Sequence, residues 1–248
     1  MGKRDISLET LTIVCWKWKP FEGYRSHFTA EHVNILASMV SRNCSGPYEV
    51  VCVTDDPVGI DSSVRTIPLW DDYADVPSPA DRKGRRRNPS CYRRLKMFSR
   101  DAGDWLGQRI LSLDLDVVIT DDIYPLVGIK DDWAAFGDTH PTTHYNGGLI
   151  LFKAGSRPQL WEDFDPIESP PLGLKRNQFG SDQAWMGACL GRGERKITTS
   201  DGIYSYRCFI RPRGGVLPDN ARIVLFHGQY DPWHEEPQKL DWVRRNYR

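Results

Sequence analysis

Short apolar runs separated by polar turns recur along the first part of the chain. The runs over 11–16, 48–54 and 64–69 have the length and the polar boundaries of buried strands. Between the first two runs, apolar residues recur at helical spacing, at Val33, Ile35, Leu36 and Met39. Strands that alternate with helices predict an α/β protein with a mostly parallel sheet, in which ligands collect beyond the carboxyl ends of the strands.

A fourth apolar run, over 110–120, carries two aspartates at its centre. If this run is one strand, Asp114 and Asp116 lie on one face, and Leu115 and its apolar neighbours lie on the other, because strand side chains alternate. Two adjacent carboxylates repel each other and resist burial unless a divalent cation lies between them. Carboxylate oxygens suit Mg²⁺ or Mn²⁺. The alternative is a strand end that reaches solvent, where carboxylates cost little.

The second half of the chain continues the alternation. Apolar runs over 132–138, 144–155 and 221–229 predict three further strands. At the start of the second run, Gly147 and Gly148 allow a close approach of the backbone to a ligand; the alternative is a simple bulge.

Helical patterns separate these strands. They are found over 91–99, 157–164, 181–190 and 231–248. Ser181 or Asp182 is placed to cap the third of these helices, and 166–180 is predicted to be a loop.

The composition narrows the class of protein. With 33 basic residues against 33 acidic ones, the chain has no overall field that draws it toward nucleic acid or an anionic membrane. Its six cysteines form no C-x-x-C pair and no zinc-ligand spacing. No apolar run approaches the length of a membrane span. We therefore expect a cytoplasmic protein with reduced thiols.

A proline- and arginine-rich segment over 74–90 interrupts the pattern of strands and helices. We predict a mobile basic loop here. Its functional interpretation is a lid over phosphates or a patch for an anionic acceptor, and the alternative is a solvated charged loop.

Six short motifs, in their order along the chain, carry a family resemblance. They are VCVTDDP, YRRL, LSLDLDVVI, YNGGLILF, FGSDQAW and IVLFHGQYDPW. The set resembles the nucleotide-sugar glycosyltransferases of the GT-A fold, nearest to glycosyltransferase family 8 and related small bacterial and phage-type enzymes. The resemblance implies one GT-A, Rossmann-like domain over 1–248, with a mixed, mostly parallel central sheet flanked by helices. It also implies transfer of a sugar from a nucleotide-diphosphate-sugar, such as a UDP-sugar, to an acceptor hydroxyl with retention of configuration.

The resemblance assigns three kinds of site residue. Asp114 and Asp116 match the D-x-D pair that holds Mn²⁺ (or Mg²⁺), and His227 matches a further metal ligand. Asp182 and Gln183 match the pair beside the anomeric carbon and are the expected catalytic residues. The expected donor-binding positions are Lys17, Trp18, Arg94, Asp114, Leu115, Asn146, Gly147, Gly148, Arg207 and Gly228.

Two positions depart from the family pattern. Asp231 stands where the family commonly has a lysine that reaches the diphosphate, and a carboxylate there would repel phosphate. Gly147 replaces the aromatic or small residue that usually follows the asparagine. These departures leave donor choice open and keep a weakened or inactive enzyme among the alternatives.

Three other functions compete with the glycosyltransferase hypothesis. A haloacid-dehalogenase-type phosphatase also has a strand that ends in D-x-D, although its motif stands near the start of its core. A sugar nucleotidyltransferase would need a glycine-rich turn after 11–16, and this chain has none there. A non-catalytic nucleotide-sugar-binding module would bind the donor without turnover. The acceptor is open among saccharides, proteins and small molecules, with DNA disfavoured by the zero net charge.

Overall fold

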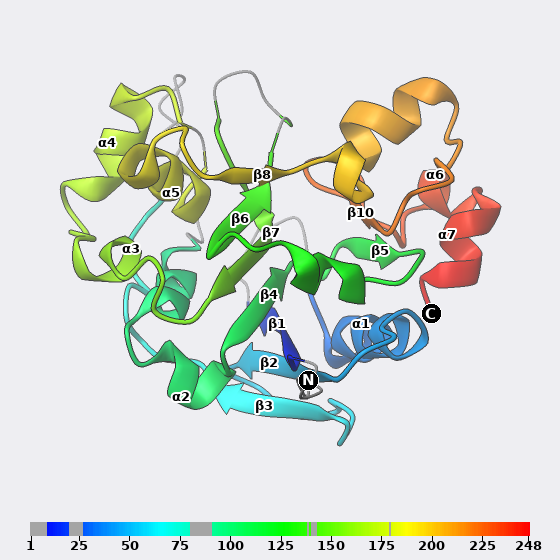
Figure 1. Cartoon of the computed structure of the whole chain (residues 1–248), viewed down its shortest axis with the longest axis horizontal. Helices are drawn as coiled ribbons and strands as arrows, with labels where there is room; N and C mark the ends of the chain where they lie inside the picture. Colours follow the sequence, from blue (N-terminus) through cyan, green and yellow to red (C-terminus); the bar gives the residue numbers. More distant parts are fainter. Residues whose placement is uncertain (1–8, 20–26, 80–90, 138, 140–142, 179) are drawn as a thin grey trace, which may run out of the picture.

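A seven-stranded sheet forms the centre of the computed structural model, which describes residues 9–19, 27–79, 91–137, 139, 143–178 and 180–248 (Figure 1). Its strands lie in the order β3-β2-β1-β4-β7-β6-β8. They span Leu11–Lys17 (β1), Tyr48–Thr54 (β2), Val64–Pro68 (β3), Arg109–Leu113 (β4), Trp133–Phe136 (β6), Asn146–Lys153 (β7) and Arg195–Ile197 (β8). All neighbouring pairs are parallel except those that β7 makes with β4 and β6. The predicted mixed, mostly parallel sheet is therefore confirmed.

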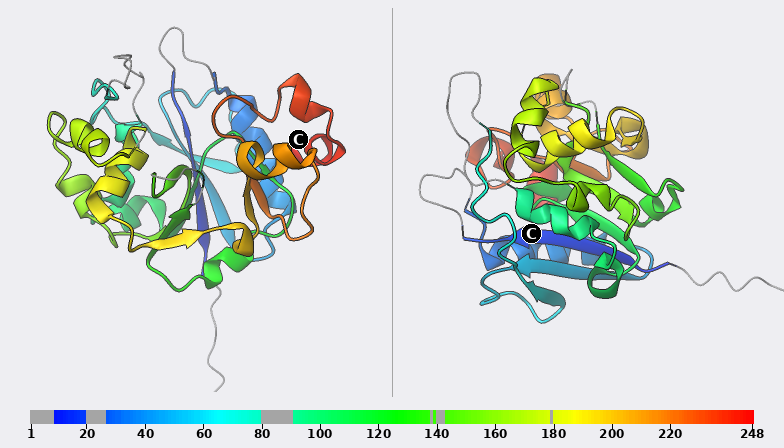
Figure 2. Two further views of the ribbon diagram at one scale, coloured as in Figure 1. Left: turned by 90° about the horizontal axis from the view of Figure 1, so that it is seen from above. Right: turned by 90° about the vertical axis from the view of Figure 1, so that its left-hand side faces the viewer.

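The two faces of this sheet are buried in two separate hydrophobic clusters. Along β1, Ile13 and Cys15 belong to one cluster, whereas Val14 and Trp16 belong to the other. Strands that are buried on both faces carry continuous apolar runs, as this one does. Figures 1 and 2 show α1, α6 and α7 beside one face and α3, α4 and α5 toward the other.

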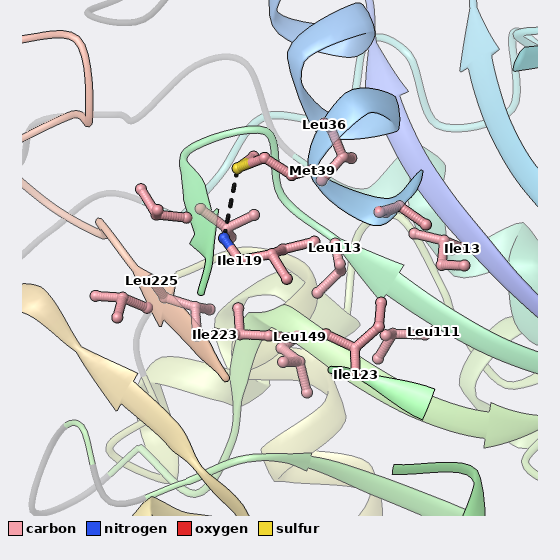
Figure 3. Close-up of a cluster of buried hydrophobic side chains, with 14 of the residues drawn as sticks. Ile13, Leu36, Met39, Leu111, Leu113, Ile119, Ile123, Leu149, Ile223 and Leu225 are labelled. Atoms are coloured by element: carbon pink, nitrogen blue, oxygen red, sulfur yellow. Dashed lines mark hydrogen bonds between the residues drawn. The ribbon is translucent and has the colours of Figure 1, made fainter. Parts of the chain in front are cut away.

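Helix α1 (Ala30–Arg42) follows the predicted helical spacing. Its buried residues Val33, Leu36, Met39 and Val40 form one apolar stripe against the first cluster. At its start, the ring nitrogen Nδ1 of His32 accepts the backbone N–H of Thr29 at 3.0 Å. The same cluster continues across β4 and β7, where Figure 3 shows Leu36 and Met39 near Leu113 and Leu149.

The run over 110–120 is not one strand, contrary to our prediction. Strand β4 ends at Leu113, residues 114–116 form a bend, and β5 (Val117–Ile119) joins a second sheet in the order β5-β10-β9. The partner strands are β9 (Ile203–Ser205) and β10 (Ile223–Leu225). The apolar pattern continues through the bend because both strands line the same hydrophobic cluster, so periodicity does not mark the change of sheet.

The remaining helices are shorter than α1. They are the 3₁₀ helices η1 (Tyr92–Phe98), η2 (Tyr124–Gly128), η3 (Thr199–Asp201) and η5 (Arg211–Arg213), the π-helix η4 (Tyr206–Ile210), and the α-helices α2 (Ala102–Leu106), α3 (Gln159–Glu162), α4 (Ser169–Lys175), α5 (Asp182–Leu190), α6 (Glu235–Gln238) and α7 (Asp241–Asn246). Among the helices of the described residues, none combines the length and the apolar character that a membrane crossing needs.

Several boundaries differ from the predictions. The predicted loop over 166–180 contains α4, because Pro170 and Pro171 lie in its first turn, where proline is tolerated. The predicted last strand is shorter, since β10 ends at Leu225, and the C-terminal helix is divided into α6 and α7. The basic run of the expected loop over 74–90 lies outside the described residues.

Candidate active site

The expected site residues gather where the carboxyl ends of parallel strands meet. Lys17 ends β1, and Asp114 follows β4. Asn146 begins β7, which is antiparallel to β4, so it lies at the same edge of the sheet. The backbone N–H of Asp114 donates to the carbonyl of Gly148 at 2.9 Å, which joins the two segments. This edge is the position at which open α/β sheets bind their ligands.

Arg94, on η1, is the centre of the polar contacts at this edge. Its side chain is buried, and its Nε and Nη2 donate to Oδ2 of Asp182 at 2.9 and 2.6 Å. Nη1 donates to Oδ1 of Asp114 at 2.5 Å, and Nη2 also donates to the carbonyl of Gly147 at 3.0 Å. Burial opposes the charge of Arg94, but the carboxylates of Asp182 and Asp114 outweigh it and hold its pKa above the ordinary range.

This network changes the role expected for two residues. The resemblance places Arg94 against the donor phosphates, but here each of its three guanidinium nitrogens donates to a protein oxygen. Asp182 does not cap α5 through its side chain, because its carboxylate faces Arg94. Ser181 is the N-cap residue but makes no side-chain cap bond, and its Oγ accepts the N–H of Cys91 at 2.8 Å. The capping interpretation is therefore wrong for both side chains.

The glycine pair lies in direct contact with this network. The N–H of Gly147 donates to Oε1 of Gln183 at 3.2 Å, and that of Gly148 donates to Oδ1 of Asn146 at 2.8 Å. A Cβ atom on Gly147 would lie 2.7 Å from Nη2 of Arg94. A Cβ on Gly148 would lie 2.9 Å from Cδ2 of Leu225. Both positions therefore favour glycine because of packing within the protein. The pairing of β7 with β6 is irregular here, since Ala135 pairs with Ile150 but Phe136 pairs with Asn146, which agrees with the bulge interpretation. A close approach of this backbone to a ligand stays a prediction.

We expect Gly147→Ala to disturb this network selectively. The added methyl group must displace a guanidinium that is pinned by two carboxylates, at a cost of about 1–3 kcal/mol. The transfer rate proposed below should fall roughly tenfold, the counterpart of about 1.4 kcal/mol. Urea denaturation and initial rates would measure both effects. Gly193→Ala is the matched control, because a Cβ there meets nothing within 4 Å. Equal behaviour of the two variants would contradict the steric argument.

A second group of polar residues surrounds His227, just beyond β10. Its Nε2 lies 2.7 Å from Oγ of Ser205, which also accepts the N–H of Cys208 at 3.0 Å. Burial and the nearby charge of Arg207 lower the pKa of His227 to about 4. The imidazole is therefore neutral at pH 7, the form that binds metal ions.

Arg207 and Gly228 lie against each other in this group. Gly228 has a φ of +94°, a conformation that favours glycine, and a Cβ there would lie 2.9 Å from Nη1 of Arg207. Arg207 is exposed, unlike Arg94. It is thus the expected donor-binding arginine with an accessible guanidinium.

The backbone segments that carry the three expected metal ligands lie side by side. The N–H of Phe226 donates to the carbonyl of Asp116 at 2.9 Å, which places the backbone of His227 beside the 114–116 bend. Two carboxylates and a neutral imidazole fit Mn²⁺ or Mg²⁺ chemically. However, no three His, Cys, Asp or Glu side chains of the described residues are already grouped to hold a metal ion. The assignment of Asp114, Asp116 and His227 as metal ligands therefore stays a prediction.

The structure buries the other expected donor-binding residues wholly or in part. Lys17 is buried, and its Nζ donates to the carbonyl of Asp56 at 2.6 Å, so its charge is directed at the loop after β2. Trp18 is partly buried against the second hydrophobic cluster. Leu115 is 1% exposed within the first cluster, so only its backbone is available to a ligand.

Asp231 does not present an open carboxylate where the family has lysine. It is only 1% exposed, and its Oδ2 lies 3.4 Å from Nε2 of His234. The carboxylate is therefore directed at His234 within the protein and is not open to a ligand. Ser205 contacts His227, and Asp56 contacts Lys17. The sequence did not identify Ser205 or Asp56 as functional residues.

Solved structures of a known galactosyltransferase share this fold. LgtC in complex with donor and acceptor sugar analogues matches with a TM-score of 0.62 and 18% identity, over 94% of this chain and 93% of that chain. An active-site variant of LgtC, with glutamine replaced by glutamate, matches with a TM-score of 0.58 and 16% identity over the same shares. No protein-family model matches the sequence, and no curated protein matches it. The structural likeness confirms the GT-A fold.

Proposed function

We propose that this protein is a metal-dependent glycosyltransferase, which moves a sugar from a nucleotide-diphosphate-sugar to an acceptor hydroxyl. The observation that carries the proposal is the buried Arg94 network, which brings Asp114 and Asp182 together at the ligand-binding edge of a GT-A fold. A UDP-sugar donor and retention of configuration follow from the resemblance and belong to the proposal.

Negative charge develops on the diphosphate as the sugar departs, and positive charge develops on the sugar ring. Asp114, Asp116 and His227 would hold Mn²⁺ or Mg²⁺, which supplies positive charge to the leaving diphosphate when bound. The exposed guanidinium of Arg207 adds a second cation on that side. Together these groups stabilise the leaving group.

Asp182 and Gln183 act on the sugar side of the site. Arg94 fixes the orientation of Asp182 through Oδ2, and Gln183 is held by the N–H of Gly147. A carboxylate and an amide oxygen are suited to stabilise an oxocarbenium-like ring or to orient the acceptor hydroxyl. Because Arg94 also donates to the carbonyl of Gly147, Asp182 is linked through Arg94 to the residue that holds Gln183, and the two side chains are preorganised relative to each other.

A donor screen tests the proposal. The purified chain is incubated with Mn²⁺ and a panel of UDP-, GDP- and other nucleotide-sugars, and release of nucleoside diphosphate and the shift in Tm are measured. We expect one donor class to raise the Tm and to be hydrolysed slowly in the absence of an acceptor, with NMR of the released sugar reporting the anomer. A Tm shift without turnover would favour a binding module, and phosphate release from a phosphomonoester would favour a phosphatase.

A further inference from the structure

Three consecutive side chains at the start of α5 bond to other segments of the candidate active site. Gly180 has a φ of +102°, a conformation that favours glycine, so the chain turns sharply just before the helix. Beyond this turn, the Asp182 carboxylate accepts from Arg94, and Oε1 of Gln183 accepts the N–H of Gly147. Ser181 precedes both residues and bonds to the start of η1, a contact to which the proposed function assigns no role.

The side chain of Ser181 does not act as its local sequence favours. A serine at the N-cap position commonly accepts an N–H group from the first turn of its own helix. Ser181 is the N-cap residue of α5 and makes no such bond, although it is only 7% exposed. Departures from a local rule are expected at functional sites, where a side chain is used for a contact elsewhere. The hydroxyl of Ser181 is used in this way, between two segments.

This hydroxyl completes a ring of hydrogen bonds. Oγ of Ser181 accepts the backbone N–H of Cys91 at 2.8 Å and donates to Oδ1 of Asp182 across a longer distance of 3.5 Å. The carbonyl of Cys91 accepts the N–H of Arg94 at 3.0 Å, and the guanidinium of Arg94 donates to Oδ2 of Asp182. Since a serine hydroxyl has a single proton, Asp182 receives it. Both oxygens of the Asp182 carboxylate are therefore bonded, each from a different side.

The ring restrains both partners of the buried ion pair. Cys91 is the N-cap residue of η1, which carries Arg94, and Asp182 is the first residue of α5. The Ser181 hydroxyl therefore holds the starts of these two helices against each other. Bonds in a buried polar network reinforce one another, so the loss of one loosens the others.

We propose that Ser181 is a positioning residue for Asp182: its hydroxyl fixes the plane of the carboxylate and holds the first turn of η1, so that Arg94 and Asp182 keep one relative orientation. The effect on sugar transfer rests on the function proposed above, whereas the effect on the ring of hydrogen bonds does not. A small displacement of a reacting group lowers the rate of the chemical step because the reacting atoms lose their alignment.

Ser181→Ala removes the hydroxyl and keeps the Asp182 carboxylate. We expect kcat to fall about tenfold while the KM for the nucleotide-sugar stays within about twofold, because donor contacts are retained and alignment is lost. The N–H of Cys91 loses its acceptor, so its hydrogen exchange, followed by NMR, should accelerate about tenfold or more.

Ser169→Ala, in α4, is the matched control. Ser169 is 4% exposed, and its Oγ accepts the backbone N–H of Asp165 at 3.0 Å, so this variant also removes a buried hydroxyl that accepts a backbone N–H group. The two variants should lose similar stability in urea. Only Ser181→Ala should change kcat and the exchange of the Cys91 amide.

A double-mutant cycle with Asp182→Ala tests the ring without an assay of transfer. Once the carboxylate is gone the ring is open, so Ser181→Ala should shift the urea midpoint less in this background than in the wild type. Additive shifts, a Cys91 amide that exchanges at the wild-type rate in Ser181→Ala, an unchanged kcat in that variant, or an equal fall of kcat in Ser169→Ala would each overturn the proposal. A wild type that turns over no nucleotide-sugar would instead refute the proposed function, and the cycle and the amide exchange would still decide whether Ser181 positions Asp182.

Discussion

An Asp116→Ala variant is expected to lose about a thousandfold or more of the metal-dependent transfer rate, because a bound cation contributes several kcal/mol to stabilising the leaving charge. The fold should persist, since the backbone carbonyl of Asp116 extends the pairing of β5 with β10 by accepting from the N–H of Phe226, and alanine retains this carbonyl. Initial rates across a Mn²⁺ titration, together with far-UV circular dichroism, measure the two effects separately.

The matched control for this variant is Asp121→Ala. Asp121 is exposed, lies two residues beyond the end of β5, and has a long surface ion pair of 3.7 Å with Arg222. Asp121→Ala should keep the transfer rate within about twofold of the wild-type rate, because exposed ion pairs contribute little to stability. Retention of full activity by Asp116→Ala would remove Asp116 from the metal site and with it the mechanism proposed here.

Arg94→Met should produce the largest loss of stability. The variant leaves the Asp182 carboxylate, whose side chain is 5% exposed, without its ion-pair partner. Breaking a buried pair in this way costs about 3–5 kcal/mol of unfolding free energy. The lost ion pair with Asp114 adds less to this cost in unfolding free energy, because the Asp114 side chain is 36% exposed and water can replace the guanidinium. Urea denaturation of the purified chain measures the difference.

Two further variants test the cause of that loss. Arg94→Met combined with Asp182→Asn should recover part of the stability, because the uncompensated charge is removed. Arg100→Met, which breaks an ion pair whose arginine side chain is 72% exposed, should cost less than about 1 kcal/mol. A loss in Arg94→Met no greater than in Arg100→Met would show that the network contributes little to stability.

The local pattern of the chain predicted its regular elements well where each is buried on a constant face. The boundaries of β2 were predicted to the residue, and three of the four predicted apolar positions of α1 (Val33, Leu36 and Met39) lie in its buried stripe. These predictions succeed because side-chain periodicity reflects burial directly. The family resemblance, through motifs in a specific order along the chain, predicted Asp114, Gly147 and Asp182 as site residues, and Arg94 contacts all three in the structure.

Local sequence patterns did not predict the contacts between segments that lie far apart along the chain. No local pattern shows that Arg94 reaches Asp182 across 88 residues, or that Ser205 meets His227. The bend at 114–116 was missed for a related reason, since both flanking strands bury apolar side chains in the same cluster.

The sequence by itself determined the first helix and most strands of the central sheet, together with the polar residues at their ends, because both depend on neighbours along the chain. It did not show α4 or the three-residue strands β8 and β9. Only the tertiary structure decided how those residues are used: Arg94 between two carboxylates, Lys17 against the next loop, and His227 against Ser205. The physical reason is that the charge and burial of a side chain are set by the segments that pack around it, and these come from distant parts of the chain.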